Sequence, residues 1–212
     1  MMSKYFAAII LLISCPLIAA ESCGNFPPSP FDDRARRITG TYANPVYGYS
    51  VDIPRGEVAY GSRAPNPNHG IGIILSWNPR AYIYFDGSHA VFDDELEREL
   101  SLDAIADYHL RVEKAGALSV LSTHVTDDHL GVLPAKRLVI EYTCPSVPGI
   151  FVTEHVVALG GGIVYSASLS SPKERYAKDR RVLAAMIKTW REVPRPPPNN
   201  ALERTTGHHG SH

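Results

Sequence analysis

Short segments of this chain alternate apolar residues with small or polar ones, and this period of two marks a half-buried β-strand. In residues 47–53 every odd position is apolar and every even position is small or polar, and Pro54 and Gly56 follow. The glycines at 160–162 predict a tight hairpin. The same patterns predict further strands over residues 71–75, 81–85, 118–125, 135–143, 151–158 and 163–169.

A helical period follows residue 100. Ser101 is a candidate N-cap, and Ile105, His109 and Val112 fall on one stripe of a helix expected over about residues 101–115. Since His109 belongs to this apolar stripe, we expect it to be a packed, hydrogen-bonded histidine.

A second helix is expected over about residues 172–191. The segment 171–174, Ser-Pro-Lys-Glu, has the pattern of a capping box with proline at the first helical position. Because short turns link the strands, we predict an α+β fold, in which the two helices cover a mostly antiparallel sheet. The apolar stripe of the second helix consists of Tyr176, Leu183, Ile187 and Trp190.

The first twenty residues, MMSKYFAAIILLISCPLIAA, have the pattern of a secretory signal peptide. Lys4 supplies the positive start, and small residues precede Glu21. The apolar run is too short to span a membrane, and Pro16 interrupts it. The segment from Leu12 to Cys15 also resembles the lipobox of bacterial lipoproteins. Lipidation of Cys15 and a membrane anchor therefore stay open as the alternative.

Export bears on the remaining cysteines and on the domain boundaries. In an oxidising compartment Cys23 and Cys144 are expected to form a disulfide. Residues 21–40 are interpreted as an extended N-terminal segment that Cys23 attaches to the domain, and residues 41–193 as a single α+β domain. Residues 194–212 begin with a proline-rich run and lack apolar periodicity, so they predict a disordered tail.

Several of these segments resemble a known superfamily. YGYSVDIP at residues 47–54, LPAKRLVIEY at 133–142, IVYSASLSS at 163–171 and a helix that closes on Trp190 resemble the PsbP-like superfamily. The resemblance covers about residues 42–192. It implies a sheet covered by helices, in a group of mostly non-enzymatic accessory proteins. It supplies no catalytic residue.

Composition narrows the function classes. The chain has 212 residues, of which 44% are hydrophobic, and its 21 basic and 22 acidic residues give a formal charge of −1. A nearly neutral chain lacks the basic footprint of nucleic-acid binders. The sequence contains no G-x-S-x-G elbow, no H-E-x-x-H pair and no phosphate-binding glycine loop, which disfavours an enzyme. We expect neither a cofactor nor a metal site.

Polar candidates for binding remain in the loops. Asn68 and His69 follow two prolines, so they are placed to face a ligand or, alternatively, to hydrogen-bond the turn. His89 follows Asp86 closely, which suggests a hydrogen-bonded pair, and residues 127–129 are expected at the tip of a turn. The candidate ligand or partner loops therefore contain Asn68, His69, His89, Asp128 and His129.

Aromatic residues gather in the first half of the chain. Tyr84 and Phe85 are neighbours on one predicted strand, so their side chains face opposite sides. Exposed tyrosines suit protein contacts, whereas ordinary sheet packing is the alternative. The candidate aromatic contact surface consists of Tyr47, Trp77, Tyr82 and Tyr84.

These features favour a non-enzymatic accessory or binding protein that is exported to the periplasm or secreted. It would contact a protein partner in the bacterial envelope, and a membrane only if Cys15 is lipidated. A periplasmic inhibitor or immunity protein against a toxin has the same sequence features. The second alternative is a small extracytoplasmic hydrolase or metal-dependent enzyme that uses His69, His89, His124 or Asp128.

Overall fold

The computed structural model describes residues 37–61, 69–89, 101–117, 119–144 and 147–195. The predicted signal peptide, Cys15, Cys23, Asn68 and most of the predicted tail lie outside these residues. The elements are β1 (Arg37–Ile38), β2 (Thr41–Asn44), β3 (Tyr49–Asp52), β4 (Ala59–Gly61), β5 (Gly70–Trp77), β6 (Arg80–His89), α2 (Leu102–Gly116), β7 (Ser119–Leu130), β8 (Leu133–Thr143), β9 (Ile150–Gly160), β10 (Ile163–Pro172), α3 (Lys173–Thr189) and β11 (Arg191–Glu192).

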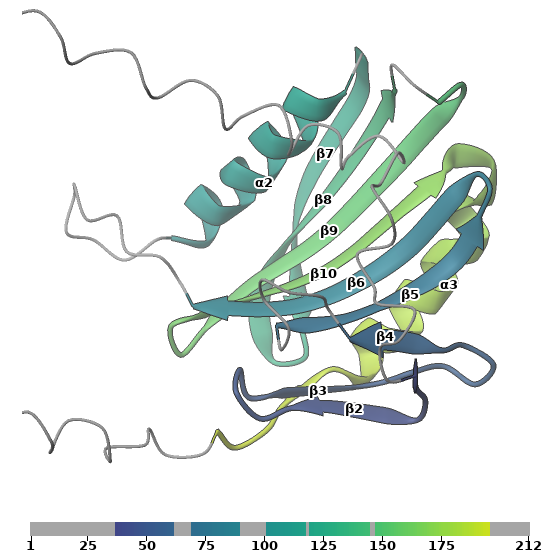
Figure 1. Cartoon of the computed structure of the whole chain (residues 1–212). Coiled ribbons are helices and arrows are strands. Elements are labelled where there is room, and N and C mark those ends of the chain that lie inside the picture. The colour runs from purple at the N-terminus through teal and green to yellow at the C-terminus, as the bar shows by residue number, and fades with distance from the viewer. Residues whose placement is uncertain (1–36, 62–68, 90–100, 118, 145–146, 196–212) are drawn as a thin grey trace, which may run out of the picture.

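Two antiparallel sheets form the body of the molecule (Figure 1). The large sheet has the strand order β1-β4-β5-β6-β10-β9-β8-β7, and the small sheet has the order β11-β3-β2. Adjacent strands of the large sheet are mostly joined by hairpins, as the short predicted turns require. The predicted α+β fold with an antiparallel sheet and two helices is therefore confirmed.

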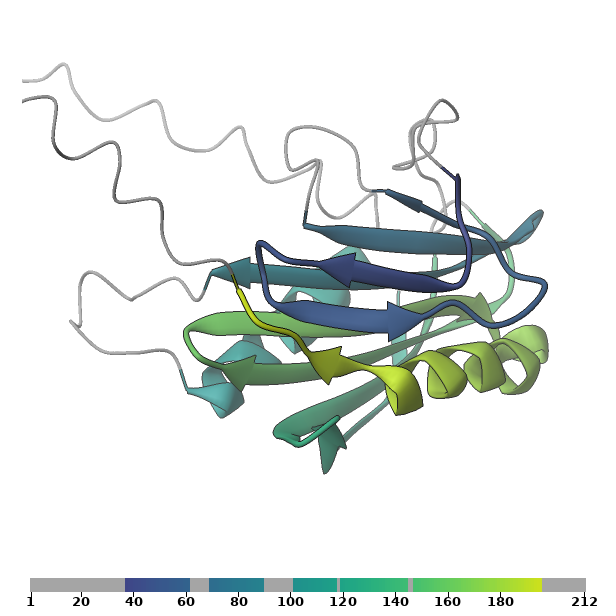
Figure 2. The ribbon, with the colours of Figure 1, turned by 90° about the horizontal axis from the view of Figure 1, so that it is seen from below.

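The large sheet is covered on both faces. Helix α3 and the small sheet pack on one face, as Figure 2 shows from below, and α2 packs on the opposite face against β8 and β9. Tyr47, Tyr49, Val51 and Ile53 are all buried in the first of these layers. Their predicted inward direction is correct, because the small sheet turns this side toward β5 and β6.

The two helix starts differ from each other. Ser101 caps α2 as predicted, since the Ala104 amide donates to its hydroxyl at 3.2 Å. The predicted capping box at 171–174 is wrong: β10 continues to Pro172 and α3 begins at Lys173 without a side-chain cap. The Ser171 hydroxyl instead donates to the buried Asp179 at 2.7 Å, because the strand pairing fixes its direction. Among the described residues, neither helix is long and apolar enough to cross a membrane.

The turn predicted at residues 127–129 is also wrong. These residues lie inside β7, and the chain turns at Gly131 and Val132 instead. Gly131 has a positive φ of 60°, which a glycine adopts without strain. The acids fit the strand because Lys136 and Arg137 on β8 form ion pairs with them across the ladder.

Candidate functional site

Tyr47 lies in the turn between β2 and β3, which Asn44 organises. The Val46 and Tyr47 amides donate to Asn44 Oδ1 at 3.1 and 3.2 Å. The Gly48 amide donates to the Asn44 carbonyl at 2.8 Å. This turn places the Tyr47 ring over β6, where Gly87 makes room: a Cβ at Gly87 would lie 2.8 Å from that of Tyr47.

His69 immediately precedes β5, and its carbonyl oxygen accepts three hydrogen bonds. The donors are the Gly87 amide at 3.0 Å, the Tyr49 hydroxyl at 3.2 Å and the Asn44 side-chain amide at 3.4 Å. With its main chain fixed in this way, His69 packs its imidazole against Tyr47. Its Nε2 lies 2.8 Å from the Tyr47 hydroxyl, and the two ring centroids are 4.8 Å apart.

Asp86, on β6, lies on the other side of this imidazole. Its Oδ1 is 3.8 Å from His69 Nδ1, which is too long for a hydrogen bond. This Oδ1 is buried and has no hydrogen-bond donor among the described residues, although the whole side chain is 28% exposed. Burial raises the pKa of Asp86 to about 6, while His69 and the Gly87 amide oppose the shift. An ionised Asp86 favours the tautomer with the proton on Nδ1, and in that tautomer the Tyr47 hydroxyl donates to Nε2.

We call Tyr47, His69, Asp86 and His89 the His69 cluster. The exposed His89 lies at the end of β6, with its ring 5.6 Å from that of Tyr47. The hydrogen-bonded pair expected from His89 and Asp86 is not formed, because residues three apart on a strand face opposite sides of the sheet. Asp86 faces His69 instead. The cluster thus offers a carboxylate beside the His69 imidazole, which packs against Tyr47, and this arrangement suits an ammonium or guanidinium group.

Sequence reasoning predicted His69 but not its surroundings. Asp86 was noted only as a neighbour of His89, and Asn44 was not singled out. The Asn-Pro dipeptide at 44–45 is a turn signal that points to the role of Asn44. The pairing of Gly70 with Asp86 is a long-range contact that no local pattern indicates.

Asp86→Asn is expected to raise the free energy of unfolding by about 2–3 kcal/mol at pH 7.5, because it removes a poorly solvated charge. The folded-state pKa of about 6 lies above the ordinary value of 3.8, so ionisation between these values disfavours the folded state. At about pH 2.5, well below the ordinary value of 3.8, the wild-type carboxyl is protonated in both states, and the difference should vanish. Urea unfolding at both pH values measures the effect.

The exposed Asp107 on α2 provides the matched control. Asp107→Asn should change stability by less than about 0.5 kcal/mol at either pH. If Asp86→Asn destabilises the protein at neutral pH, then Asp86 is held by favourable contacts and its assignment as an uncompensated carboxylate is wrong.

The predicted aromatic surface does not form as one surface. Tyr47 is only 6% exposed, because it packs under the small sheet. Tyr82 and Tyr84 are half-buried on the opposite face of β6 from Phe85, as the alternation predicted. Trp77 is 67% exposed at the β5–β6 turn, with the Arg80 guanidinium 5.5 Å from its ring. Of the four, Trp77 alone is well exposed.

Asp128 belongs to an ion-pair network instead of a ligand loop. Arg137 Nε donates to Asp128 Oδ2 at 2.6 Å, and the same guanidinium contacts the buried Glu154. From α3, Arg180 Nε and the Tyr176 hydroxyl donate to Glu154 at 3.0 and 2.5 Å. The network links β7, β8, β9 and α3, which gives Asp128 a structural role. His129 is exposed on β7.

A second group of titratable residues lies under α2. His155 Nε2 is 3.0 Å from Glu113 Oε1, and the His109 ring lies 5.2 Å from that of His155. Burial, together with His155, lowers the pKa of His109 to about 3. His109 is packed between helix and sheet as predicted. Nowhere in the described ranges do three His, Cys, Asp or Glu side chains lie close enough to hold a metal ion.

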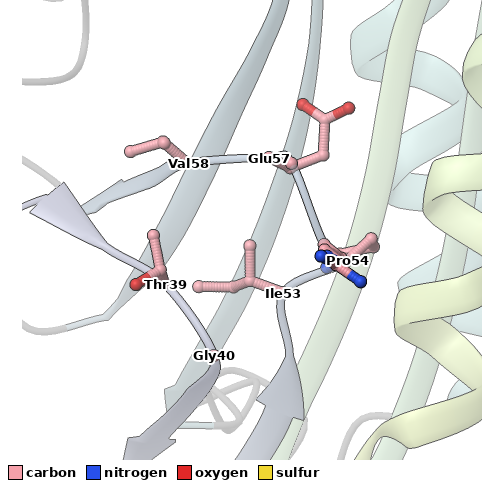
Figure 3. A pocket seen from close by; sticks show the side chains of 8 residues that line it. Thr39, Gly40, Ile53, Pro54, Glu57 and Val58 are labelled. Carbon is pink, nitrogen blue, oxygen red and sulfur yellow. The ribbon is translucent and has the colours of Figure 1, made fainter.

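A shallow hollow of about 430 Å³ lies beyond the C-terminal end of β3, whereas Tyr47 lies before its N-terminal end (Figure 3). It lies between the β1–β2 turn at Thr39 and Gly40 and the loop that follows Ile53. None of the candidate residues from the sequence lines it. Cys144 is buried on the α2 face of the sheet. Because Cys23 lies outside the described residues, the disulfide stays a prediction.

Comparisons with known proteins bear on the fold alone. No family model matches the chain, and no curated protein matches it. LpqN of Mycobacterium tuberculosis has a similar structure, with a TM-score of 0.50 and 12% identity over 77% of this chain and 94% of its own. The cyanobacterial PsbP of Synechocystis sp. PCC 6803 matches with a TM-score of 0.48 and 12% identity over 75% and 94% of the two chains.

A third similar structure comes from Bacteroides thetaiotaomicron. Its TM-score is 0.46 and its identity 12%, and the match covers 73% of this chain. This chain spans about half of that protein, 48% of its length. The sheet covered by helices that the resemblance implied is present, and the similarity to LpqN is likewise one of fold.

Proposed function

We propose that this chain is an exported, non-enzymatic accessory protein of the bacterial envelope, and that a protein partner docks a cationic side chain on the His69 cluster. The observation that carries the proposal is the buried Oδ1 of Asp86, which has no donor among the described residues. A buried carboxylate oxygen without a donor lowers stability. Such an arrangement is characteristic of a site whose donor comes from a ligand.

The surroundings of Asp86 suggest the chemistry of this donor. His69 lies 3.8 Å from Asp86, which is too long for a hydrogen bond, so an incoming cation would meet an incompletely neutralised carboxylate. The His69 ring lies beside Asp86, and the rings of Tyr47 and His89 extend this aromatic surface from His69. A lysine or arginine side chain combines the donor with a charge that aromatic faces attract.

Two further observations support an envelope role. The first twenty residues have the pattern of a secretory signal. LpqN, which shares the fold, is involved in cell envelope biogenesis of Mycobacterium tuberculosis. The inhibitor alternative is one form of this proposal, since an inhibitor is also an exported protein that binds a partner.

The test is site-specific photo-crosslinking in the organism of origin. A photoreactive amino acid at the exposed position 89 should capture one defined protein, and Asp86→Asn should abolish that product. The same probe at Glu174, which is exposed on α3, is the matched control and should capture nothing specific. Crosslinks that survive Asp86→Asn unchanged, or that form equally from position 174, contradict docking at this cluster.

Partner affinity should depend on pH in a defined direction. A bound cation favours ionised Asp86, so binding is expected to be strongest above pH 7 and to weaken by up to about tenfold per pH unit below pH 6. Titration of the purified pair at several pH values measures the slope. For Asp86→Asn the residual binding should lose this dependence, whereas a slope retained in the variant would assign it to another group.

The hydrolase alternative is tested with the same variants. A small-substrate activity that His69→Ala or Asp86→Asn abolishes would replace the binding proposal with an enzymatic one. Tyr47 is a poor nucleophile in this setting, because burial and the nearby Asp86 raise the pKa of its hydroxyl.

A further inference from the structure

The outer edge of β7 is long and lacks a partner strand in the part of the chain that the structure describes. β7 runs from Ser119 to Leu130 and is the last strand of the large sheet, where it pairs only with β8. The other end of the sheet is β1, which has two residues. A long open edge carries a row of main-chain donors and acceptors that invites pairing with another strand.

The side chains of this edge do not oppose such pairing. Leu121 and Val125 are 50% and 48% exposed, although both are apolar. Asp127 pairs with Lys136 at 2.8 Å, a lysine that also pairs with Asp103, and Asp128 pairs with Arg137, so each acid of β7 has a cationic partner on β8. The register shift between Val120 and Ser122 lies at one end and leaves the ladder regular from Ser122 onward.

We propose that β7 pairs with β7 of a second copy of this chain, antiparallel and centred on Val125. A two-fold axis through Val125 places the residues equidistant from it opposite each other. Thr123 then faces Asp127, and Ser122 faces Asp128, so that hydroxyls can donate to carboxylates. At the centre, the exposed Val125 side chains of the two copies contact each other, a favourable β-branched pair.

This self-complementarity favours a second copy over an unrelated strand. An axis near residues 127 and 128 would set acid against acid, and such like-charge pairs are destabilising. The axis at Val125 sets no acid opposite another acid, and it buries the exposed Val125 side chain in the middle of the strand. The proposal is independent of the His69 cluster. That cluster lies next to β5 and β6, which β10, β9 and β8 separate from β7 in the strand order.

The first test is the mass of the purified full-length protein in solution. Sedimentation equilibrium at micromolar concentrations should give a dimer for the wild type. Val125→Lys brings two ammonium groups together at the axis and should raise the dimer Kd by at least about 100-fold. Val132→Lys, at the more exposed β7–β8 turn, is the matched control and should remain dimeric. Far-UV circular dichroism checks that both variants fold.

The second test fixes the register. Directly opposed residues of antiparallel strands lie within reach of a disulfide, so Val125→Cys should give a covalent dimer on a non-reducing gel. Val132→Cys should give none. A wild-type monomer, a dimer that Val125→Lys leaves intact, or the absence of a crosslink in Val125→Cys each overturns the proposal. Pairing of β7 with a different protein while the chain itself stays monomeric would also overturn it.

Discussion

Glu154→Gln is expected to lower the free energy of unfolding by about 3 kcal/mol. Glu154 is fully buried on β9, where it pairs with Arg137 and accepts hydrogen bonds from Arg180 and Tyr176. The neutral amide keeps the shape but leaves the two guanidinium groups without their shared counter-charge. Removing one member of a buried ion pair typically lowers stability by about 3–5 kcal/mol, and the half-exposed Arg180 regains some hydration, which favours the lower end.

A surface ion pair supplies the control for this variant. Glu141 accepts from Lys173 Nζ at 2.6 Å, but the lysine side chain is 50% exposed. Glu141→Gln should therefore lower stability by less than about 1 kcal/mol. Chemical unfolding of both variants gives the comparison. If the two variants have equal effects, the buried network contributes no more to stability than a solvated pair, and its role in holding α3 on the sheet is wrong.

Much of the fold is predictable because local rules and tertiary packing agree. In residues 47–53 the period of two predicted which side chains point inward, and every odd position is buried. Ser101 had the chemistry of an N-cap, and its hydroxyl accepts the Ala104 amide. In both places a short segment contains all the information that its conformation needs.

The wrong predictions of a turn at residues 127–129 and of a capping box at residues 171–174 share a different cause. Residues 127–129 are polar and look like a turn, but they form a strand because their partners lie on β8. Ser171 has the chemistry of a helix cap, but its hydroxyl donates to Asp179, which lies eight residues later in the sequence, on α3. Polar residues at these positions are satisfied by groups that only the folded chain brings near, so a local motif does not identify them.

The candidate site shows the same limit. The prolines and Gly70 identified the His69 loop, but the groups around His69 come from the β2–β3 turn and from β6. Sequence proximity suggested that Asp86 pairs with His89, whereas strand alternation directs the two side chains to opposite faces. Strand register, which is a tertiary property, decides which groups meet at the site.

The two buried titratable clusters should affect acid stability in opposite directions. Asp86 has a raised pKa, so protonation of this carboxyl as the pH falls toward 4 favours the folded state. His109 has a lowered pKa, so the unfolded state gains protons first as the pH falls, and the folded state is disfavoured. The wild-type pH profile is a sum of such terms, and single variants are needed to separate them.

Between pH 7 and pH 4 the burial of His109 should lower the free energy of unfolding of the wild type by about 3 kcal/mol. His109→Phe is expected to abolish this decrease. The folded-state pKa of His109 is about 3 against an ordinary value of 6.5, because the ring is buried under α2 and lies near His155. Phenylalanine keeps an aromatic ring there and takes up no proton. Denaturant unfolding across this range should give a flatter profile for the variant, whereas His129→Gln, at an exposed position on β7, should follow the wild type. Parallel wild-type and His109→Phe profiles would show that His109 is protonated as readily in the folded state as in the unfolded chain.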